Sequence, residues 1–322
     1  MHPLLSEAKE RLYSKLYQDL GEKIIGFLKD RDVHEIMLNP DGKCWIDHAA
    51  QGLLFVSTLT ERKATAIIQS VAGIQGCIVT KESPRLEAKL PFYKELQGER
   101  FTAQIPPIVP SPSFTIRKRS EHVFRLLDYI ASNRLTLKQL LILRELIRDR
   151  KNILVCGGPG SGKTTVTNAL IVEAVQHDPN QRFVILEDLP ELQCEAQNCV
   201  SLVTSEQVDL QGLLRSAMRM RPDRILVGEV RGREALDMLK AWNTGCPGGI
   251  CTVHANGAAD AIQRIIDLAM ESQLTSPPLS LVSHTINAIV SVVRKGSQKG
   301  FIQDILSLGA YQDGQFTFTK LG

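Results

Sequence analysis

Residues 157–164 read GGPGSGKT, and this stretch decides the fold of the chain. It fits the pattern G-x-x-x-x-G-K-[ST], in which successive backbone N–H groups surround the phosphates of a nucleoside triphosphate. An apolar run predicts a buried strand over residues 152–156, and helical periodicity follows over residues 165–176. Strand, glycine loop and helix in this order are the context that the motif requires. A glycine-rich turn followed by a chance Lys-Thr does not account for both neighbours.

The loop predicts a site for ATP and Mg²⁺. We expect Lys163 to reach the β and γ phosphates and Thr164 to place its hydroxyl on the metal ion. The N-terminus of the following helix adds partial positive charge at the same point. The nucleotide-binding residues predicted from the motif are Gly158, Pro159, Gly160, Ser161, Gly162, Lys163 and Thr164.

Composition sets the broad class. A chain of 322 residues favours two domains, and its apolar fraction of 43% is ordinary for a protein with real cores. The net charge of +3 is too weak to imply a nucleic-acid partner by itself. The apolar stretches are shorter than the about 20 residues that span a bilayer. The seven cysteines include no C-x-x-C pair, which favours free thiols in a reducing compartment over a zinc site or disulfides.

The pattern along the chain predicts a small α+β domain over residues 1–120, a linker over 121–136 and a larger α/β domain over 137–322. The first domain is expected to begin with amphipathic helix over 4–30, and a proline-rich segment at 106–112 reads as a loop between two strands. From residue 137, helices alternate with short apolar strands, which indicates a mostly parallel sheet. The expected strands are 33–38, 44–47, 86–90, 100–105 and 113–117, then 152–156, 183–186, 225–228 and 250–253; the expected helices are 61–72, 210–220, 233–244 and 258–271.

Acidic residues follow two of the apolar strands. Ligands of open α/β sheets bind at the carboxyl ends of strands, so Glu187 and Asp188, after the strand at 183–186, are expected to point at the nucleotide. A carboxylate there can orient water for attack on the γ phosphate, and we favour Glu187 for this role. The alternative is an acid that caps a turn or a helix.

Two more strand ends carry candidate residues. Glu229 follows the strand at 225–228 and is predicted to hold Mg²⁺, directly or through a bound water; the alternative is a surface glutamate. His254 ends the strand at 250–253, where an imidazole can hydrogen-bond a phosphate oxygen, although a lone histidine is more often structural.

Arginines supply the remaining candidates. Arg100 and Arg117 flank the proline-rich loop, and a first domain folded over the second could bring them to the nucleotide, where hydrolysis needs extra positive charge. The alternative is solvated surface charge. A basic trio at 117–119 is weak support for contact with nucleic acid, and no nucleic-acid site is evident.

The phosphate loop, the two acidic strand ends and His254 occur in the order of four motifs of the secretion ATPase superfamily: the Walker A, Asp, Walker B and His boxes. Further segments resemble the TrbB-like conjugative transfer ATPases of type IV (VirB-type) secretion. These segments are residues 35–42 (EIMLNPDG), 98–101 (GERF), 106–107 (PP), 114–118 (FTIRK), 191–194 (ELQC) and 235–242 (ALDMLKAW).

The resemblance implies a RecA-like ATPase domain behind a smaller PAS-like domain, with nucleotide between them. It implies a homohexameric ring, peripheral on the cytoplasmic face of the inner membrane, that works with other components of a secretion channel. By position, Thr165 joins Lys163 and Thr164 in binding phosphates and Mg²⁺. Glu187 resembles the catalytic acid of the family, and Glu229, His254, Arg100 and Arg117 occupy the positions of its remaining catalytic residues.

The chain departs from the family pattern at two positions. Cys246 stands where relatives commonly have histidine, and Pro159 where Thr or Ser is frequent. The four-cysteine insertion of type II secretion ATPases is absent, which argues against that branch. The expected function is an ATP-hydrolysing motor for conjugation or type IV secretion. The alternatives are a motor for pilus assembly or retraction, a nucleic-acid-stimulated motor with the same core, and a nucleotide-binding scaffold without turnover.

Overall fold

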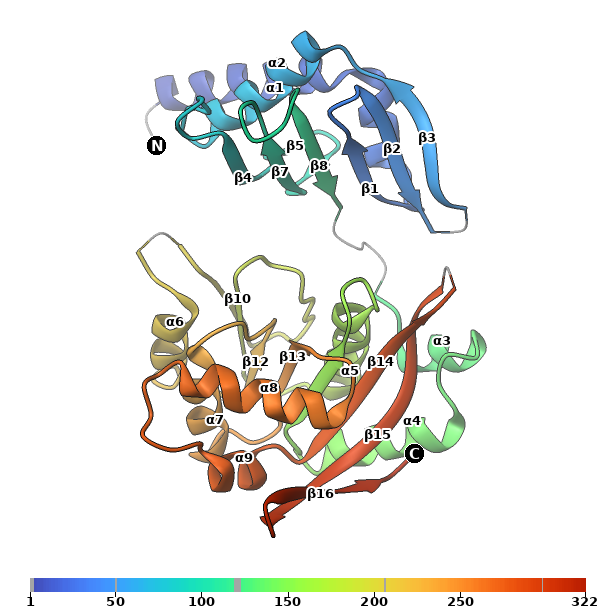
Figure 1. The fold of residues 1–322 in the computed structure, drawn as a ribbon, viewed down its shortest axis with the longest axis vertical. Helices are drawn as coiled ribbons and strands as arrows, with labels where there is room; N and C mark the ends of the chain where they lie inside the picture. The colour runs from blue at the N-terminus through green and yellow to red at the C-terminus, as the bar shows by residue number, and fades with distance from the viewer. Residues whose placement is uncertain (1–2, 50, 119–122, 206, 297) are drawn as a thin grey trace. The chain divides into compact units, whose positions relative to one another are not determined.

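A computed structural model describes residues 3–49, 51–118, 123–205, 207–296 and 298–322 (Figure 1). The chain divides into two compact units, Met1–Glu121 and His122–Gly322. The division lies next to the predicted end of the first domain at residue 120. Among the described residues, none of the helices combines the length and the apolar character that a bilayer crossing demands.

The first unit is an antiparallel sheet with two helices. The strand order is β3-β2-β1-β8-β7-β4, and a separate two-stranded ribbon pairs β5 with β6. Its elements are α1 (Pro3–Lys29), β1 (Val33–Leu38), β2 (Lys43–His48), β3 (Gly52–Thr58), α2 (Glu61–Ile74), β4 (Arg85–Lys89), β5 (Phe92–Tyr93), β6 (Leu96–Gln97), β7 (Arg100–Gln104) and β8 (Ser113–Arg117).

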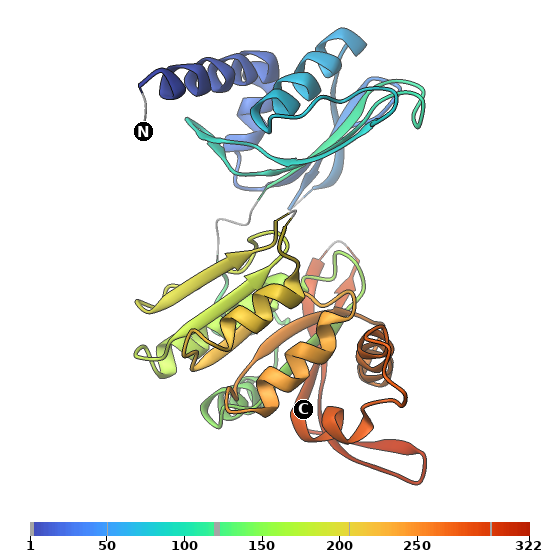
Figure 2. The same ribbon diagram turned by 90° about the vertical axis from the view of Figure 1, so that its left-hand side faces the viewer.

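Alternation along the strands places one set of side chains against the helices. Ile36, Phe101 and Ile116 are fully buried in one core with the apolar faces of α1 and α2, and both helices lie on the same side of the sheet (Figure 2). The helix α1 is broken at Gly21, whose φ of 71° is not helical, so it forms two segments. The predicted strands of this unit are present, and the proline-rich loop joins β7 to β8 as expected. The strand β3 and the β5–β6 ribbon were not predicted.

The second unit is an α/β fold around a sheet of eight strands, ordered β11-β10-β12-β13-β9-β14-β15-β16. The strands from β11 to β14 run parallel, whereas β15 and β16 are antiparallel additions. Its elements are α3 (Leu126–Ala131), α4 (Leu137–Arg148), β9 (Ile153–Gly157), α5 (Lys163–His177), β10 (Phe183–Glu187), β11 (Cys199–Val203), α6 (Leu210–Ala217), β12 (Arg224–Val227), α7 (Glu234–Asn243), β13 (Ile250–His254), α8 (Ala258–Met270), α9 (Leu279–Thr285), β14 (Ala288–Lys295), β15 (Gln298–Gln312) and β16 (Gln315–Lys320).

Helices cover both faces of this sheet, as a mostly parallel sheet requires. In β9, Leu154 and Cys156 pack toward α6, α7, α8 and α9, while Ile153 and Val155 pack toward α3, α4 and α5 (Figures 1 and 2). The central strands β9, β10 and β12 are buried along their whole length. These strands are apolar because helices cover the sheet on both faces. Their polar residues stand only at the first or last position of a strand.

Several segments of the second unit differ from the sequence-based expectation, and one of them is the unpredicted edge strand β11. Within the predicted linker at 121–136, the described residues contain α3, and Leu126 and Tyr129 are buried in the core that includes α5. The backbone N–H of Arg125 donates to the Asp128 carboxylate and caps this short helix. These two polar residues therefore belong to the start of the helix. At the other end, β14, β15 and β16 extend the sheet beyond the four strands expected in this domain.

One arginine of the second unit, Arg224, has a structural role. The Arg224 guanidinium is 1% exposed and donates to Gln181 Oε1 at 2.6 Å, Ile147 O at 2.8 Å and Gly248 O at 3.0 Å. Burial lowers its pKa to about 10. It begins β12, whereas the acidic candidates lie at the opposite ends of the strands, so Arg224 belongs to the scaffold and not to the chemistry.

Candidate functional site

The phosphate loop lies between the carboxyl end of β9 and the first turn of α5. Gly162, the residue before α5, has a φ of 96°, which favours glycine. A Cβ on Gly157 would lie 2.3 Å from the carbonyl oxygen of Val292 in β14, and one on Gly162 would lie 2.9 Å from the backbone nitrogen of Gly300 in β15. The loop is therefore held in its curled form by backbone of β14 and β15, and only glycine fits at these two positions.

The loop is suited to an anion. Ser161 is 4% exposed, and its hydroxyl has no hydrogen-bond partner among the described residues. A cavity of about 170 Å³ adjoins the loop. Its lining includes Gly157, Gly158, Pro159, Ser161, Asn256 and Arg294. A buried hydroxyl without a partner costs free energy unless a ligand satisfies it, and a phosphate oxygen at the amino end of α5 would do so.

Lys163 places its ammonium at the same point. Its Nζ donates to the carbonyl oxygens of Gly157 at 3.0 Å and Gly158 at 3.2 Å, and it lies 3.1 Å from Nδ1 of His254. The side chain is 7% exposed, so the charge is directed along the loop and away from bulk water. Lys163 and His254, two residues predicted to contact the phosphates, therefore lie together beside the loop.

Glu187 ends β10 and is 2% exposed. Its Oε1 accepts the backbone N–H groups of Glu191 and Leu192, both at 2.7 Å. Hydrogen bonds of this kind to a carboxylate are strong and fix its orientation. Asp188 is more exposed and contacts Thr204 Oγ1 at 3.3 Å and Arg231 at 3.9 Å. Of the two acids, Glu187 is the one held at the edge of the sheet where β9, β12 and β13 also end.

A chain of polar contacts connects Lys163 to the acidic side of the site. Nε2 of His254 lies 2.9 Å from Oε1 of Glu229, and Arg231 donates to Oε2 of Glu229 at 2.7 Å. Because Nδ1 faces the Lys163 ammonium, we assign the imidazole proton to Nε2, on the side of the ring that faces Glu229. Burial lowers the pKa of His254, and the charges of Lys163 and Arg231 lower it further against the opposing effect of Glu229. The imidazole is therefore neutral at physiological pH.

Sequence reasoning missed Glu191 and Asn168 as site residues. Thr164 Oγ1 donates to Oε2 of Glu191 at 3.3 Å, so this carboxylate lies beside the hydroxyl predicted to bind Mg²⁺. The Asn168 side chain, one turn further along α5, donates to the Glu191 carbonyl at 3.2 Å and accepts the Gln193 N–H at 2.9 Å. The only sequence signal for Glu191 was its place in the family segment at 191–194.

The residues fit a hard divalent cation. Mg²⁺ prefers hydroxyl, carboxylate and water oxygens, and the Thr164 hydroxyl with the carboxylate of Glu191 provides that chemistry beside the phosphate loop. Glu229, the other predicted metal residue, makes its contacts instead with His254 and Arg231. From this position, Glu229 is suited to contact Mg²⁺ through a metal-bound water. Thr165 lies in the first turn of α5 with Lys163 and Thr164.

Arg100 and Arg117 belong to the first unit. They are directly opposite each other on β7 and β8, and Arg117 also pairs with Glu35 on β1, at 3.6 Å. Lys89 on β4 faces Arg100 across the next pair of strands. These residues form a row on one face of the sheet, opposite the face that α1 and α2 cover. Arg119 of the basic trio lies outside the described residues.

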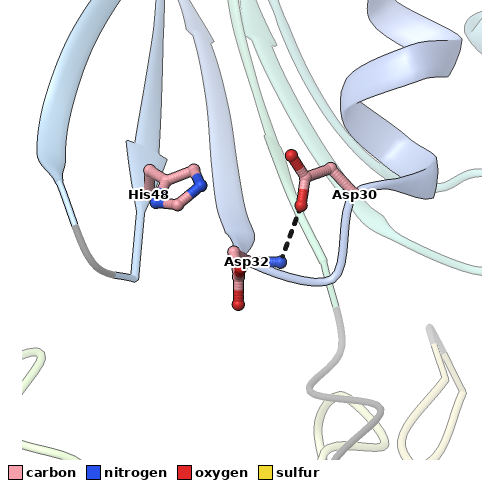
Figure 3. Close-up of side chains that lie close together, drawn as sticks. All are labelled: Asp30, Asp32 and His48. Carbon is pink, nitrogen blue, oxygen red and sulfur yellow. Dashed lines mark hydrogen bonds between the residues drawn. The ribbon is translucent and has the colours of Figure 1, made fainter.

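A second group of titratable residues lies between α1 and the β1–β2 hairpin. The ligand atoms of Asp30, Asp32 and His48 are within 4.8 Å of one another (Figure 3). Asp30 accepts the backbone N–H of Asp32 at 3.0 Å, the arrangement of a turn in which an aspartate bonds the backbone two residues on. Both aspartates are exposed, and this bond explains the turn that leads from α1 into β1.

Comparison with known proteins agrees with the geometry. The family described as "Type II/IV secretion system protein" matches residues 24–306. The chain is 42% identical over 308 residues to "Conjugal transfer protein TrbB" of Rhizobium radiobacter, which covers 95% of this chain and 93% of the relative. It is 31% identical to "Type IV secretion system protein VirB11" of Bartonella henselae (strain ATCC 49882 / DSM 28221 / CCUG 30454 / Houston 1), with 85% of each chain covered.

Solved structures show the same fold. The pilus retraction motor PilT, determined with bound ADP, superposes with a TM-score of 0.61 at 20% identity, covering 92% of this chain and 81% of PilT. At this identity the likeness concerns the fold alone. It is consistent with the α/β architecture and mostly parallel sheet described above.

Proposed function

The chain belongs to the type II/IV secretion system protein family, and from this membership we propose that it is the ATP-hydrolysing motor of a conjugation or type IV secretion channel. One observation supports hydrolysis most strongly. Beside the phosphate loop, the imidazole of His254 contacts the ammonium of Lys163 on one side and the carboxylate of Glu229 on the other. A scaffold that only bound nucleotide would not need acids at the strand ends.

The proposed reaction is hydrolysis of ATP to ADP and phosphate. The loop amides, Ser161 and Lys163 hold the phosphate tail. The Thr164 hydroxyl would be a ligand of Mg²⁺, which would supply positive charge to the phosphate tail when bound. Glu187, fixed by two backbone N–H groups, orients the attacking water. The N–H of neutral His254 can donate to a phosphate oxygen, and the contact of the same ring with Glu229 would pass the loss of that phosphate on to Glu229 and Arg231.

The coupling belongs to the same proposal. We assign residues 1–120 to a PAS-like domain and residues 137–322 to a RecA-like ATPase domain, with residues 121–136 between them. The active form is a homohexameric ring that works with other components of the secretion channel. It is peripheral on the cytoplasmic face of the inner membrane. Movement of the first domain on the second would transmit hydrolysis to the channel.

Turnover is expected to rise with assembly. If the site is completed by a neighbouring subunit or domain, ATPase activity per chain should increase with protein concentration, in step with the mass of the assembly. ATP hydrolysis and light-scattering mass, measured on the same samples with magnesium present, test this. Constant activity per chain across the transition from monomer to ring would argue against shared sites, and no hydrolysis at any size would end the proposal.

Arg100→Ala and Arg117→Ala are expected to slow turnover by about 10²-fold or more, because an arginine that stabilises charge in phosphoryl transfer acts in the transition state. Nucleotide affinity should change little. Lys89→Ala provides a matched control, since Lys89 lies in the same cross-strand row. Steady-state kinetics with nucleotide titrations separate the two effects. Unchanged kinetics in both arginine variants would remove this role and leave these side chains as surface charge.

A pilus motor is the nearest alternative within the family. The identity of 42% to the conjugal transfer relative favours conjugation, because the likeness to PilT is one of fold. Neighbouring genes separate the two: genes for a mating channel support the proposal, whereas pilin genes beside this one would favour the alternative.

A further inference from the structure

An arginine that the sequence did not single out lies at the edge of the sheet where the phosphate loop begins. Arg294 is near the end of β14, which runs parallel to β9 and pairs with it as far as Ser291 beside Cys156. Because the strands are parallel, the residues after Ser291 come level with the residues after Cys156. The carbonyl oxygen of Val292 lies against Gly157 accordingly. Arg294 is therefore level with the phosphate loop.

The cavity of about 170 Å³ beside the loop has the chemistry of an anion site. Arg294 lines it together with Gly158, Ser161 and Asn256. Among the lining residues that the structure describes, Arg294 is the only charged one, and none is an acid. The hydroxyl of the buried Ser161 has no hydrogen-bond partner in the described part of the chain. A guanidinium, an amide and a buried hydroxyl, without a competing carboxylate, favour an oxyanion as the ligand.

The guanidinium of Arg294 keeps donors for such a ligand. Its Nε donates to the carbonyl oxygen of Gly296 at 2.8 Å, whereas its two Nη atoms make no hydrogen bond to any described residue. The bond at Nε restrains one edge of the planar group and leaves the Nη–H donors for another partner. An arginine in this state can bind two oxygens of one phosphate group.

The cavity adjoins the part of the loop that takes the end of the phosphate tail. Nζ of Lys163, which is predicted to reach the β and γ phosphates, donates to the carbonyl oxygens of Gly157 and Gly158. Both glycines line the cavity. Lys163 also lies 3.1 Å from His254, and the two residues that follow His254 form another part of the lining. A phosphate group in the cavity would therefore be the last of the tail.

We propose that Arg294 and Ser161 form a subsite for the terminal phosphate group on the β14 side of the loop. The group is the γ phosphate of bound ATP or the free phosphate that hydrolysis releases, because both present the same oxygens. The inference rests on the proposed function, which supplies the nucleotide. It adds a cation from the second unit, whereas Arg100 and Arg117 belong to the first. The second unit would then distinguish ATP from ADP with its own residues.

The test compares nucleotide binding by the full chain and by Arg294→Ala, with magnesium present. Affinity for ATPγS, a slowly hydrolysed analogue of ATP, should fall about tenfold or more, because hydrogen bonds between a cation and an oxyanion are lost. Affinity for ADP should stay close to that of the unaltered chain, since ADP lacks the γ group. Arg294→Lys should recover only part of the loss, because an ammonium keeps the charge but not the planar fork.

Lys295→Ala is the matched control. Lys295 is the next residue of β14, is exposed, and places its Nζ 4.8 Å from the centroid of the Phe301 ring. It is not among the described residues that line the cavity. A general effect of positive charge would weaken binding in both variants, whereas a direct contact would weaken it only in Arg294→Ala. A thermal melt of each variant shows whether the chain is folded.

Inorganic phosphate separates the two sources of the terminal group, and its affinity for the ADP complex is measured in the same variants. Weaker binding of ATPγS alone would assign the subsite to the γ phosphate, and weaker binding of inorganic phosphate alone would assign it to the released phosphate. If Arg294→Ala leaves both affinities unchanged, or if Lys295→Ala lowers them equally, the inference is overturned. An unaltered chain that binds neither nucleotide would instead refute the proposed function, and the subsite with it.

Discussion

Lys163→Ala is expected to abolish ATP turnover, with a loss of about 10³-fold or more, while the protein stays folded. The ammonium of Lys163 lies at the phosphate loop and is the only side-chain cation of the predicted nucleotide-binding set. Removing it takes away a charge that acts on the β and γ phosphates as negative charge shifts during hydrolysis. The variant loses the two hydrogen bonds from Lys163 Nζ to the carbonyl oxygens of Gly157 and Gly158, but the loop keeps its backbone contacts with β14 and β15.

Steady-state ATPase rates and a thermal melt of the purified variant measure the two halves of this expectation. Lys151→Ala is the matched control: Lys151 is exposed and precedes β9, at the opposite end of the strand from the loop. It should retain both turnover and melting temperature. Normal turnover in Lys163→Ala would discard the assignment of residues 157–164 as the phosphate site.

Glu187→Gln is expected to retain nucleotide and to lose hydrolysis by about 10²–10⁴-fold. The amide oxygen of glutamine can still accept the N–H groups of Glu191 and Leu192, so the loop between β10 and β11 keeps its place. The amide cannot take a proton from the attacking water, and it provides no negative charge to orient it. The variant therefore separates binding from chemistry.

Binding of a fluorescent nucleotide and single-turnover hydrolysis together test this separation. Asp188→Asn is the comparison, because Asp188 is the next residue and was the second candidate for the same role. It contacts Thr204 and Arg231 and should lose much less activity. Full activity in Glu187→Gln together with loss in Asp188→Asn would move the water-orienting role to the second acid.

Much of the site could be predicted because its parts are local in sequence. The phosphate loop is a continuous motif with its strand and helix on either side. The buried strands are apolar on both faces, so the polar residues that end them, Glu187 and His254, stand out in the sequence. Because the strands are parallel, these ends meet at one edge. The same reasoning correctly placed Lys163 and His254 near each other.

The rest depends on how distant segments pack. Glu191 lies in an irregular loop, and only the folding of that loop toward α5 brings its carboxylate to Thr164. The sequence did not indicate that Arg231 donates to Glu229, a contact that only the structure shows. The burial of Arg224 in the scaffold was likewise not predicted from the sequence. Periodicity and composition do not encode such tertiary partners.

The C-terminal strands have a role that their position at the end of the chain conceals. Val292 of β14 and Gly300 of β15 lie against Gly157 and Gly162, so the floor of the triphosphate cradle comes from a part of the sequence that follows every motif. A chain shortened after α9 would still contain the residues of all four sequence motifs. It would nevertheless lose the support that keeps the cradle curled before any nucleotide arrives.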